Sequence, residues 1–156
     1  MSTVQATNVT CPHCGRTNRV PVAAEGRPTC GNCEQPLPWT ADAGDDDFTE
    51  VVEQATVPVV VDLWATWCGP CRMVSPALEK VATDLAGKIK LVKVDIDKNP
   101  RLAQRFEVQA VPTLLVLDNG QTIARQAGAA PAPALRRWVE QSIAGREPAR
   151  PPAGKG

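Results

Sequence analysis

The sequence predicts an α/β protein with a mixed central sheet flanked by helices, preceded by a small cysteine-rich segment. From residue 45 onward, apolar runs of strand length alternate with stretches of helical periodicity. This part ends in two apolar runs joined by turn residues, which indicates a hairpin. Alternating strands and helices that end in a hairpin form a mixed sheet with helices on both faces.

Composition divides the chain into three expected parts. Residues 1–37 have little apolar bulk but contain four of the six cysteines. Residues 38–145 form the regular α/β domain, entered through the acidic stretch 38–47. Residues 146–156 are rich in Pro, Gly and charge, so we expect a disordered tail.

The first half of the α/β domain contains two strands and two helices. A short strand is expected near Trp39, and residues 45–55 read as a short helix whose aspartates cap its first turn. The β-branched apolar run 57–65 predicts a strand covered on both faces. Helical periodicity then predicts a long helix over about 68–86, which Pro76 should kink. Its apolar face comprises Val74, Ala77, Leu78, Val81 and Leu85.

The second half continues with a strand over 89–97 and a short helix over 99–108. Asn99 is the expected cap of that helix, and Pro100 suits its first turn. Residues 112–128 read as a hairpin around the turn sequence DNG. A closing helix is marked by Leu135, Trp138, Val139 and Ile143.

Charge and hydropathy argue against several classes of protein. With 17 basic and 17 acidic residues, no net charge attracts the chain to nucleic acid or anionic membranes. No apolar run approaches the roughly 20 residues of a spanning helix. The first residues lack the basic start and apolar stretch of a secretory signal. We therefore expect a cytoplasmic protein, where paired cysteines more often bind metal or catalyse than form structural disulfides.

The first two Cys-x-x-Cys pairs, Cys11/Cys14 and Cys30/Cys33, have the spacing of a zinc site. Each tight turn supplies two converging sulfurs, and a segment this small needs metal to stabilise its fold. Four sulfur ligands leave no open position, so one structural zinc ion is expected, with His13 outside the ligand set. Iron, disulfides and free cysteines are the weaker alternatives.

The third pair, Cys68 and Cys71, lies where a buried strand passes into a helix. The first N–H groups of a helix lack internal partners, and they stabilise a sulfur there as thiolate. Cys71 lies one turn later on the same face, within reach of a disulfide. Arg72 adds positive charge, and no second ligand pair remains in this domain for a metal. The pair is therefore predicted to be redox-active, with metal binding or plain packing as alternatives.

The sequence VDLWATWCGPC, followed by KVDID, AVPT and GQTIARQAGA, resembles the thioredoxin family over residues 38–144. Together with the amino-terminal cysteine segment, the chain is similar to the bacterial thioredoxin 2 type. The resemblance implies the thioredoxin fold, here preceded by a zinc-ribbon-like or zinc-knuckle domain.

The resemblance also implies roles for individual residues. Cys68 is the attacking thiolate and Cys71 the resolving thiol. Asp62 exchanges the proton of Cys71, and Lys93 is its partner. Burial in an apolar strand should raise the pKa of Asp62, although a hydrogen-bonded structural Asp is the alternative. The alternative for Lys93 is an ordinary exposed strand lysine with no role in exchange.

The expected substrate surface surrounds the redox pair. The family has a cis proline at the position of Pro112, and Trp64 is expected to pack beneath the site. Arg72 and Phe106 depart from the commonest family residues, lysine and a hydroxyl-bearing aromatic, at the border of this surface. The implied substrate contacts are Trp67, Gly69, Pro70, Val111, Pro112 and Gly128.

The predicted function is protein disulfide reduction by thiol–disulfide exchange. No glycine-rich nucleotide motif follows a strand, so neither nucleotide nor flavin is expected to bind. By resemblance, the partners are disulfide-containing clients and thioredoxin reductase, and the chain is a monomer. The alternative is a zinc-dependent binding module or chaperone that uses the α/β domain as a scaffold.

Overall fold

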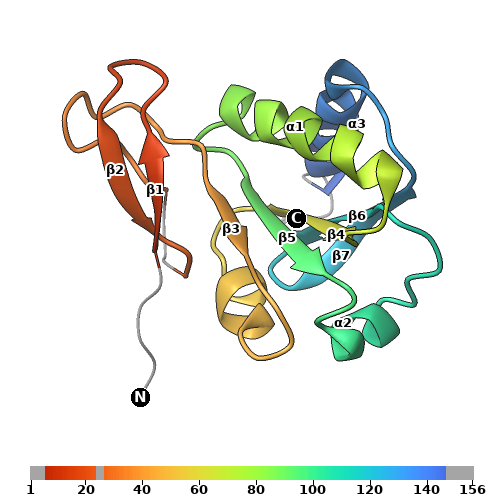
Figure 1. Ribbon diagram of the computed structural model, residues 1–156. Helices are drawn as coiled ribbons and strands as arrows, with labels where there is room; N and C mark the ends of the chain where they lie inside the picture. Colours follow the sequence, from red (N-terminus) through yellow and green to blue (C-terminus); the bar gives the residue numbers. More distant parts are fainter. Residues whose placement is uncertain (1–5, 24–26, 147–156) are drawn as a thin grey trace, which may run out of the picture.

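The computed structural model describes residues 6–23 and 27–146 as two sheets and their covering helices (Figure 1). None of the helices in these ranges is long and apolar enough to cross a bilayer. Of the tail expected from residue 146, residues 147–156 lie outside the described part, while Arg146 still belongs to the last helix.

The central sheet has five strands in the order β3-β5-β4-β6-β7. The first three are parallel to one another, and β6 and β7 are antiparallel to their neighbours. This is the mixed sheet predicted from the sequence. Its strands are β3 (Thr40–Asp42), β4 (Val59–Trp64), β5 (Lys90–Asp95), β6 (Thr113–Asp118) and β7 (Gln121–Ala127).

Helices cover both faces of this sheet (Figure 1). The long helices α1 (Gly69–Asp84) and α3 (Ala132–Arg146) lie on one face and pack against alternate residues such as Val60 and Leu114. On the other face, α2 (Pro100–Arg105) and the helical turn η1 (Thr49–Glu53) cover residues such as Val61. Because side chains alternate along a strand, Asp62 points to the α1 face.

The acidic run after residue 44 differs from the prediction. Instead of an ordinary α-helix, residues 49–53 form one π-helical turn, in which Gln54 N–H donates to Thr49 O. The Asp45 carboxylate does cap a helix, but that helix is α2, where it accepts from Arg101 N–H and Leu102 N–H.

The cap predicted at Asn99 is confirmed in its position but not in its hydrogen bonding. Asn99 occupies the N-cap position of α2, but its side chain makes no capping hydrogen bond. Its amide accepts from Asp45 N–H and donates to Asp95 O, because it links the loop before η1 to the end of β5. Asp45, 54 residues earlier in the chain, supplies the capping oxygens instead.

The hairpin turn between β6 and β7 has the predicted chemistry. Asn119 has φ 52° and Gly120 has φ 80°, and two consecutive positive φ angles are typical of a type I′ turn. Asparagine and glycine tolerate this left-handed region better than other residues.

The cysteine-rich segment forms its own small sheet. Strands β1 (Ala6–Thr10) and β2 (Thr17–Pro21) pair as an antiparallel hairpin beside the central sheet (Figure 1). The sequence analysis did not predict these strands, since they are short and largely polar. Cys11, Val20, Cys30, Leu37 and Trp39 pack together with Val57 of the body, so the segment shares a core with it.

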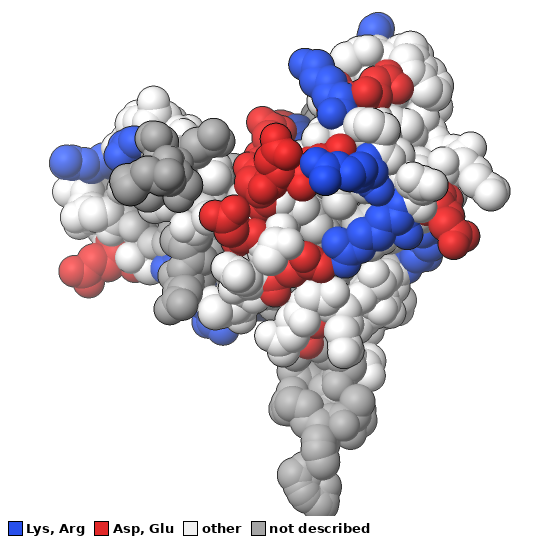
Figure 2. Space-filling view, turned by 90° about the horizontal axis from the view of Figure 1, so that it is seen from below, with Lys and Arg blue, Asp and Glu red and all other residues white. Residues whose placement is uncertain are grey.

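Charged side chains on the outside of the body are mixed in sign. Figure 2 shows acidic and basic side chains interleaved on the lower face. Ion pairs among the described residues include Arg101 with Asp45 and Asp46, and Arg105 with Glu53. This face presents no large field of one sign.

Candidate functional site

A disulfide joins Cys68 and Cys71 at the start of α1, with 5.3 Å between their Cα atoms. Cys68 is the N-cap residue of α1, and its sulfur accepts a hydrogen bond of 3.1 Å from Cys71 N–H. Both residues are almost fully buried. The Cys68 sulfur thus lies at the helix end where the sequence analysis expects a thiolate to be stabilised in the reduced protein.

The loop before β6 faces this disulfide. The Val111–Pro112 bond is cis, and Val111 O lies 3.5 Å from the Cys68 sulfur. Gly128 N–H donates to Pro112 O at 2.9 Å, and its φ of 92° suits glycine. The structure thus places the predicted cis proline and Gly128 beside the redox pair.

Trp67 forms the exposed edge of the site. Its side chain is 67% exposed, and its indole N–H donates to the Asp97 carboxylate at 2.9 Å. Gly69 and Pro70, on the first turn of α1, are also exposed. The predicted contact residues therefore surround the disulfide. Asp97, which orients the indole, was not predicted.

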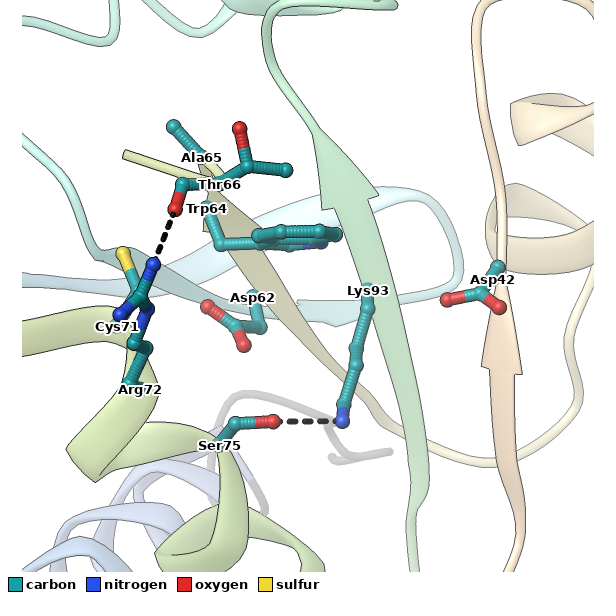
Figure 3. A pocket seen from close by; sticks show the side chains of 9 residues that line it. All are labelled: Asp42, Asp62, Trp64, Ala65, Thr66, Cys71, Arg72, Ser75 and Lys93. Carbon is teal, nitrogen blue, oxygen red and sulfur yellow. Dashed lines mark hydrogen bonds between the residues drawn. The ribbon is translucent and has the colours of Figure 1, made fainter. Parts of the chain in front are cut away.

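A cavity of about 450 Å³ lies beneath the disulfide, between α1 and the strands (Figure 3). Asp62 and Cys71 both line it, and Trp64 forms one wall. Within the described residues, neither Asp62 Oδ1 nor Trp64 Nε1 has a hydrogen-bond partner. Burial raises the pKa of Asp62 to about 6, against a smaller lowering effect of the Lys93 charge.

Lys93 lies on the neighbouring strand, directly opposite Asp62 in the register. Its ammonium group, however, donates to Ser75 Oγ at 2.7 Å and to the Glu79 carboxylate at 2.5 Å. The predicted partnership with Asp62 is therefore electrostatic rather than a direct contact.

The four cysteines of the amino-terminal segment converge on one point. All four sulfurs lie within 4.8 Å of one another, and the Cys11–Cys33 and Cys14–Cys30 pairs are each 3.6 Å apart. A tetrahedral ion with metal–sulfur bonds of about 2.3 Å holds its sulfurs roughly 3.8 Å apart. The donor set therefore fits a thiophilic metal ion.

Hydrogen-bond donors surround these sulfurs. Backbone N–H groups of His13 and Asn32 donate to Cys11 and Cys30, respectively. The side-chain amide of Asn18 also donates to Cys30, and that of Asn32 to Cys14. The sequence analysis missed both asparagines, although asparagine near a cysteine turn is a recognisable donor.

The pKa values of these thiols diverge. The backbone N–H of Cys33 is the largest cause that lowers the pKa of Cys30, to about 6. Although a Gln35 hydrogen bond lowers the pKa of Cys33, burial and the neighbouring thiols raise it to about 12. Without a metal ion the four thiols would therefore not all ionise at neutral pH, and a cation between the sulfurs would be needed to hold all four as thiolates.

A buried lysine joins the cysteine segment to the body. Lys90 at the start of β5 is fully buried, and its ammonium donates to Val22 O of the segment and, at 2.7 Å, to Val51 O of the body. It lies 4.1 Å from the ring centre of Trp39, whose indole N–H donates to Pro21 O at 3.0 Å. Burial lowers the pKa of Lys90 to about 8. Sequence analysis missed this joint.

Comparison with known proteins identifies the α/β domain. A family model described as thioredoxin matches residues 39–141. Thioredoxin of Haemophilus influenzae is 43% identical over 99 residues, covering 64% of this chain and 92% of its own length. Thioredoxin of Rhodospirillum rubrum is 44% identical over 99 residues, covering 64% and 95%, respectively.

One relative extends the similarity toward the amino terminus. Thioredoxin C-3 of Corynebacterium nephridii is 35% identical over 138 residues, covering 86% of this chain and 94% of its own length. Residues 39–156 make up less than 86% of the chain, so an alignment that covers 86% of it must include part of the cysteine-rich segment.

Proposed function

Because the chain belongs to the thioredoxin family and is a thiol–disulfide oxidoreductase, we propose that it reduces disulfides in client proteins. The observation that supports this most strongly is the Cys68 sulfur at the amino end of α1, beside the exposed Trp67 surface. The helix end favours the thiolate, and the surface can receive an extended client chain. The Gly-Pro dipeptide between the cysteines resembles the reducing members of the family.

The first step is attack of the Cys68 thiolate on one sulfur of the client disulfide. A mixed disulfide forms between Cys68 and the client, while the second client sulfur leaves as a thiolate and takes a proton. Trp67, Gly69, Pro70, Val111, Pro112 and Gly128 are the proposed contacts of the client backbone.

The second step releases the client. Cys71 gives its proton to the Asp62 carboxylate across the cavity that both line, and its thiolate attacks the Cys68 sulfur. The Cys68–Cys71 disulfide forms and the client leaves as a thiolate, so two electrons have moved to the client. A carboxyl with a pKa near 6 is a suitable proton acceptor and donor at neutral pH.

A coupled assay tests the reductase function. With NADPH and a flavin-dependent thioredoxin reductase, we expect catalytic amounts of the chain to reduce insulin continuously. NADPH oxidation and insulin precipitation should rise in proportion to the chain added. A rate no higher than that of the reductase alone would contradict the proposal and favour a binding module or chaperone.

Asp62→Asn should raise stability at neutral pH while slowing the second step. The pKa of Asp62 is raised from 3.8 to about 6, so the folded state binds the proton more tightly than the unfolded state. Stability contributed by the protonated carboxyl is therefore lost as pH rises through this window. A shift of about two pH units corresponds to roughly 3 kcal/mol at pH 7.5.

Urea unfolding of wild type and Asp62→Asn at several pH values measures this. We expect the variant to be more stable by about 2–3 kcal/mol at pH 7.5 and equal to wild type near pH 3, where Asp62 is protonated in both states. An advantage that persists at pH 3 would show that the ionisation of Asp62 is not its cause.

For the cysteine segment, we propose a structural zinc site like that of the bacterial thioredoxin 2 type. Cys11, Cys14, Cys30 and Cys33 would hold one ion, which would stabilise the fold of residues 1–37 without taking part in exchange. The convergence of the four sulfurs and the reach of the Corynebacterium nephridii alignment support this. Residues 38–145 would form the redox domain, acting as a monomer in the cytoplasm.

A further inference from the structure

Three carboxyl groups surround Lys93, and it contacts only one of them. In the register of the sheet, Asp42 of β3 and Asp62 of β4 lie directly to either side of Lys93 on β5. The side chains of Asp42, Asp62 and Lys93 line one cavity. A lysine between two carboxylates would ordinarily pair with either of them. Figure 3 shows instead that the Lys93 side chain extends toward Ser75 of α1, and its ammonium makes no drawn hydrogen bond to either aspartate.

Two residues of α1 account for this direction. Ser75 accepts from the Lys93 ammonium at 2.7 Å and Glu79 at 2.5 Å. Cys71, Ser75 and Glu79 are spaced four residues apart, so they lie on one helix face in successive turns. The Lys93 side chain is 16% exposed, whereas Glu79 is 54% exposed and lies at the outer end of this row.

We propose that Ser75 and Glu79 are positioning residues for disulfide exchange, because they anchor the Lys93 ammonium on α1 and keep it out of contact with the Asp62 carboxyl. The inference rests on the proposed role of Asp62 as proton acceptor for Cys71. It assigns no contact with the client to either residue.

Because Ser75 and Glu79 hold the Lys93 ammonium, burial remains the dominant influence on the pKa of Asp62. An opposite charge in contact would lower the pKa of a carboxyl by about 1–3 units and make Asp62 a poor base at neutral pH. The other charged groups at the cavity do not replace Lys93. Asp42 is itself acidic, and the Arg72 guanidinium donates to Thr66 O. Leu114, opposite Asp62 on β6, is apolar.

The test is to release the anchor and measure Asp62 directly. In Ser75→Ala/Glu79→Gln, the freed Lys93 should approach Asp62. We expect the carboxyl titration midpoint of Asp62, followed by 13C NMR, to fall by about one pH unit or more. Resolution of a mixed disulfide with a model peptide should slow at pH 7. No change, or a rise in the midpoint, would overturn the proposal.

A Lys93→Met background separates the anchor from the direct effect of the Glu79 charge. If the anchor acts through Lys93, the same two substitutions in that background should shift the Asp62 midpoint several-fold less. An equal shift in both backgrounds would overturn the proposal. Asp84→Asn, which removes another carboxylate of α1 that pairs with Lys80 and Arg136, is the matched control and should leave the midpoint unchanged.

This measurement is independent of the proposed function. The titration of Asp62 needs neither client nor reductase. A chain that fails to reduce insulin but shows the Lys93-dependent shift would contradict the reductase function and support the anchor. A chain that reduces insulin normally but shows no shift of the Asp62 midpoint would support the reductase function and contradict the anchor.

Discussion

Cys68→Ser should lower the rate of insulin reduction by at least about a thousandfold, as expected when a catalytic nucleophile is removed. A serine hydroxyl stays protonated at the end of α1 and cannot form a mixed disulfide, so no electrons can pass to the client. The fold should survive, because the substitution changes one buried atom. The coupled assay with NADPH and reductase measures the rate, and circular dichroism checks the fold.

Cys71→Ser is the matched control, because it removes a thiol from the same turn without removing the nucleophile. This variant should also turn over poorly, but it should accumulate a mixed disulfide with the client that Cys68→Ser never forms. Non-reducing electrophoresis and mass spectrometry distinguish the two. If Cys68→Ser retained activity, or if both variants trapped clients equally, Cys68 would not be the attacking thiolate.

Removing metal from the cysteine segment is expected to have the largest effect on stability. Binding of structural zinc by four thiolates contributes on the order of 10 kcal/mol in small zinc domains, and this segment has little apolar core of its own. A chelator strong enough to extract the ion should therefore unfold β1 and β2. We expect four thiols to become reactive together in a Cys68→Ser/Cys71→Ser background.

Metal analysis and thiol titration measure this result. The purified chain should contain one zinc ion, and its four remaining thiols should react slowly before chelation and rapidly afterwards. Cys14→Ser should weaken binding strongly, whereas His13→Ala should not, since the His13 side chain is outside the proposed ligand set. Prompt reaction of all four thiols without chelator would contradict a metal site, and the absorbance of an iron–thiolate centre would identify iron instead.

The redox pair and the four-cysteine site could be predicted because their signals are local in the sequence. A Cys-x-x-Cys motif that follows a buried strand and opens a helix places one sulfur at the helix end, independently of the rest of the fold. The two earlier pairs have both the ligand type and the spacing of a zinc site. Apolar periodicity likewise predicted the strands and long helices of the body, since each element buries a face of its own.

What could not be predicted depends on residues far apart in the chain. Asp45 caps α2 because the fold brings the loop before η1 to the start of that helix. Lys93 contacts α1 rather than Asp62, because Ser75 and Glu79 of that helix accept hydrogen bonds from its ammonium. Neither pairing leaves a pattern in any short stretch of sequence.

Lys90 shows the same difficulty in its strongest form. A lysine in a mostly apolar strand would ordinarily be predicted to point to solvent at the edge of the sheet. Lys90 is instead fully buried. Its carbonyl partners lie 68 and 39 residues away. The body supplies Val51 O and the Trp39 ring, and the packing of the cysteine segment against the body completes the environment of Lys90.

The Lys90–Trp39 joint limits how this chain can be taken apart or transplanted. Cutting before Pro38 would remove the Val22 acceptor of Lys90 and the Pro21 acceptor of the Trp39 indole, and would expose to water the apolar surface of Trp39 and Val57 that packs against the segment. The shortened body would therefore be a weakened protein rather than a clean comparison, because exposing apolar surface that is normally buried costs about 25 cal/mol per Å². Conversely, a graft of the segment onto another family member would also need a lysine at the position of Lys90 and a tryptophan at the position of Trp39.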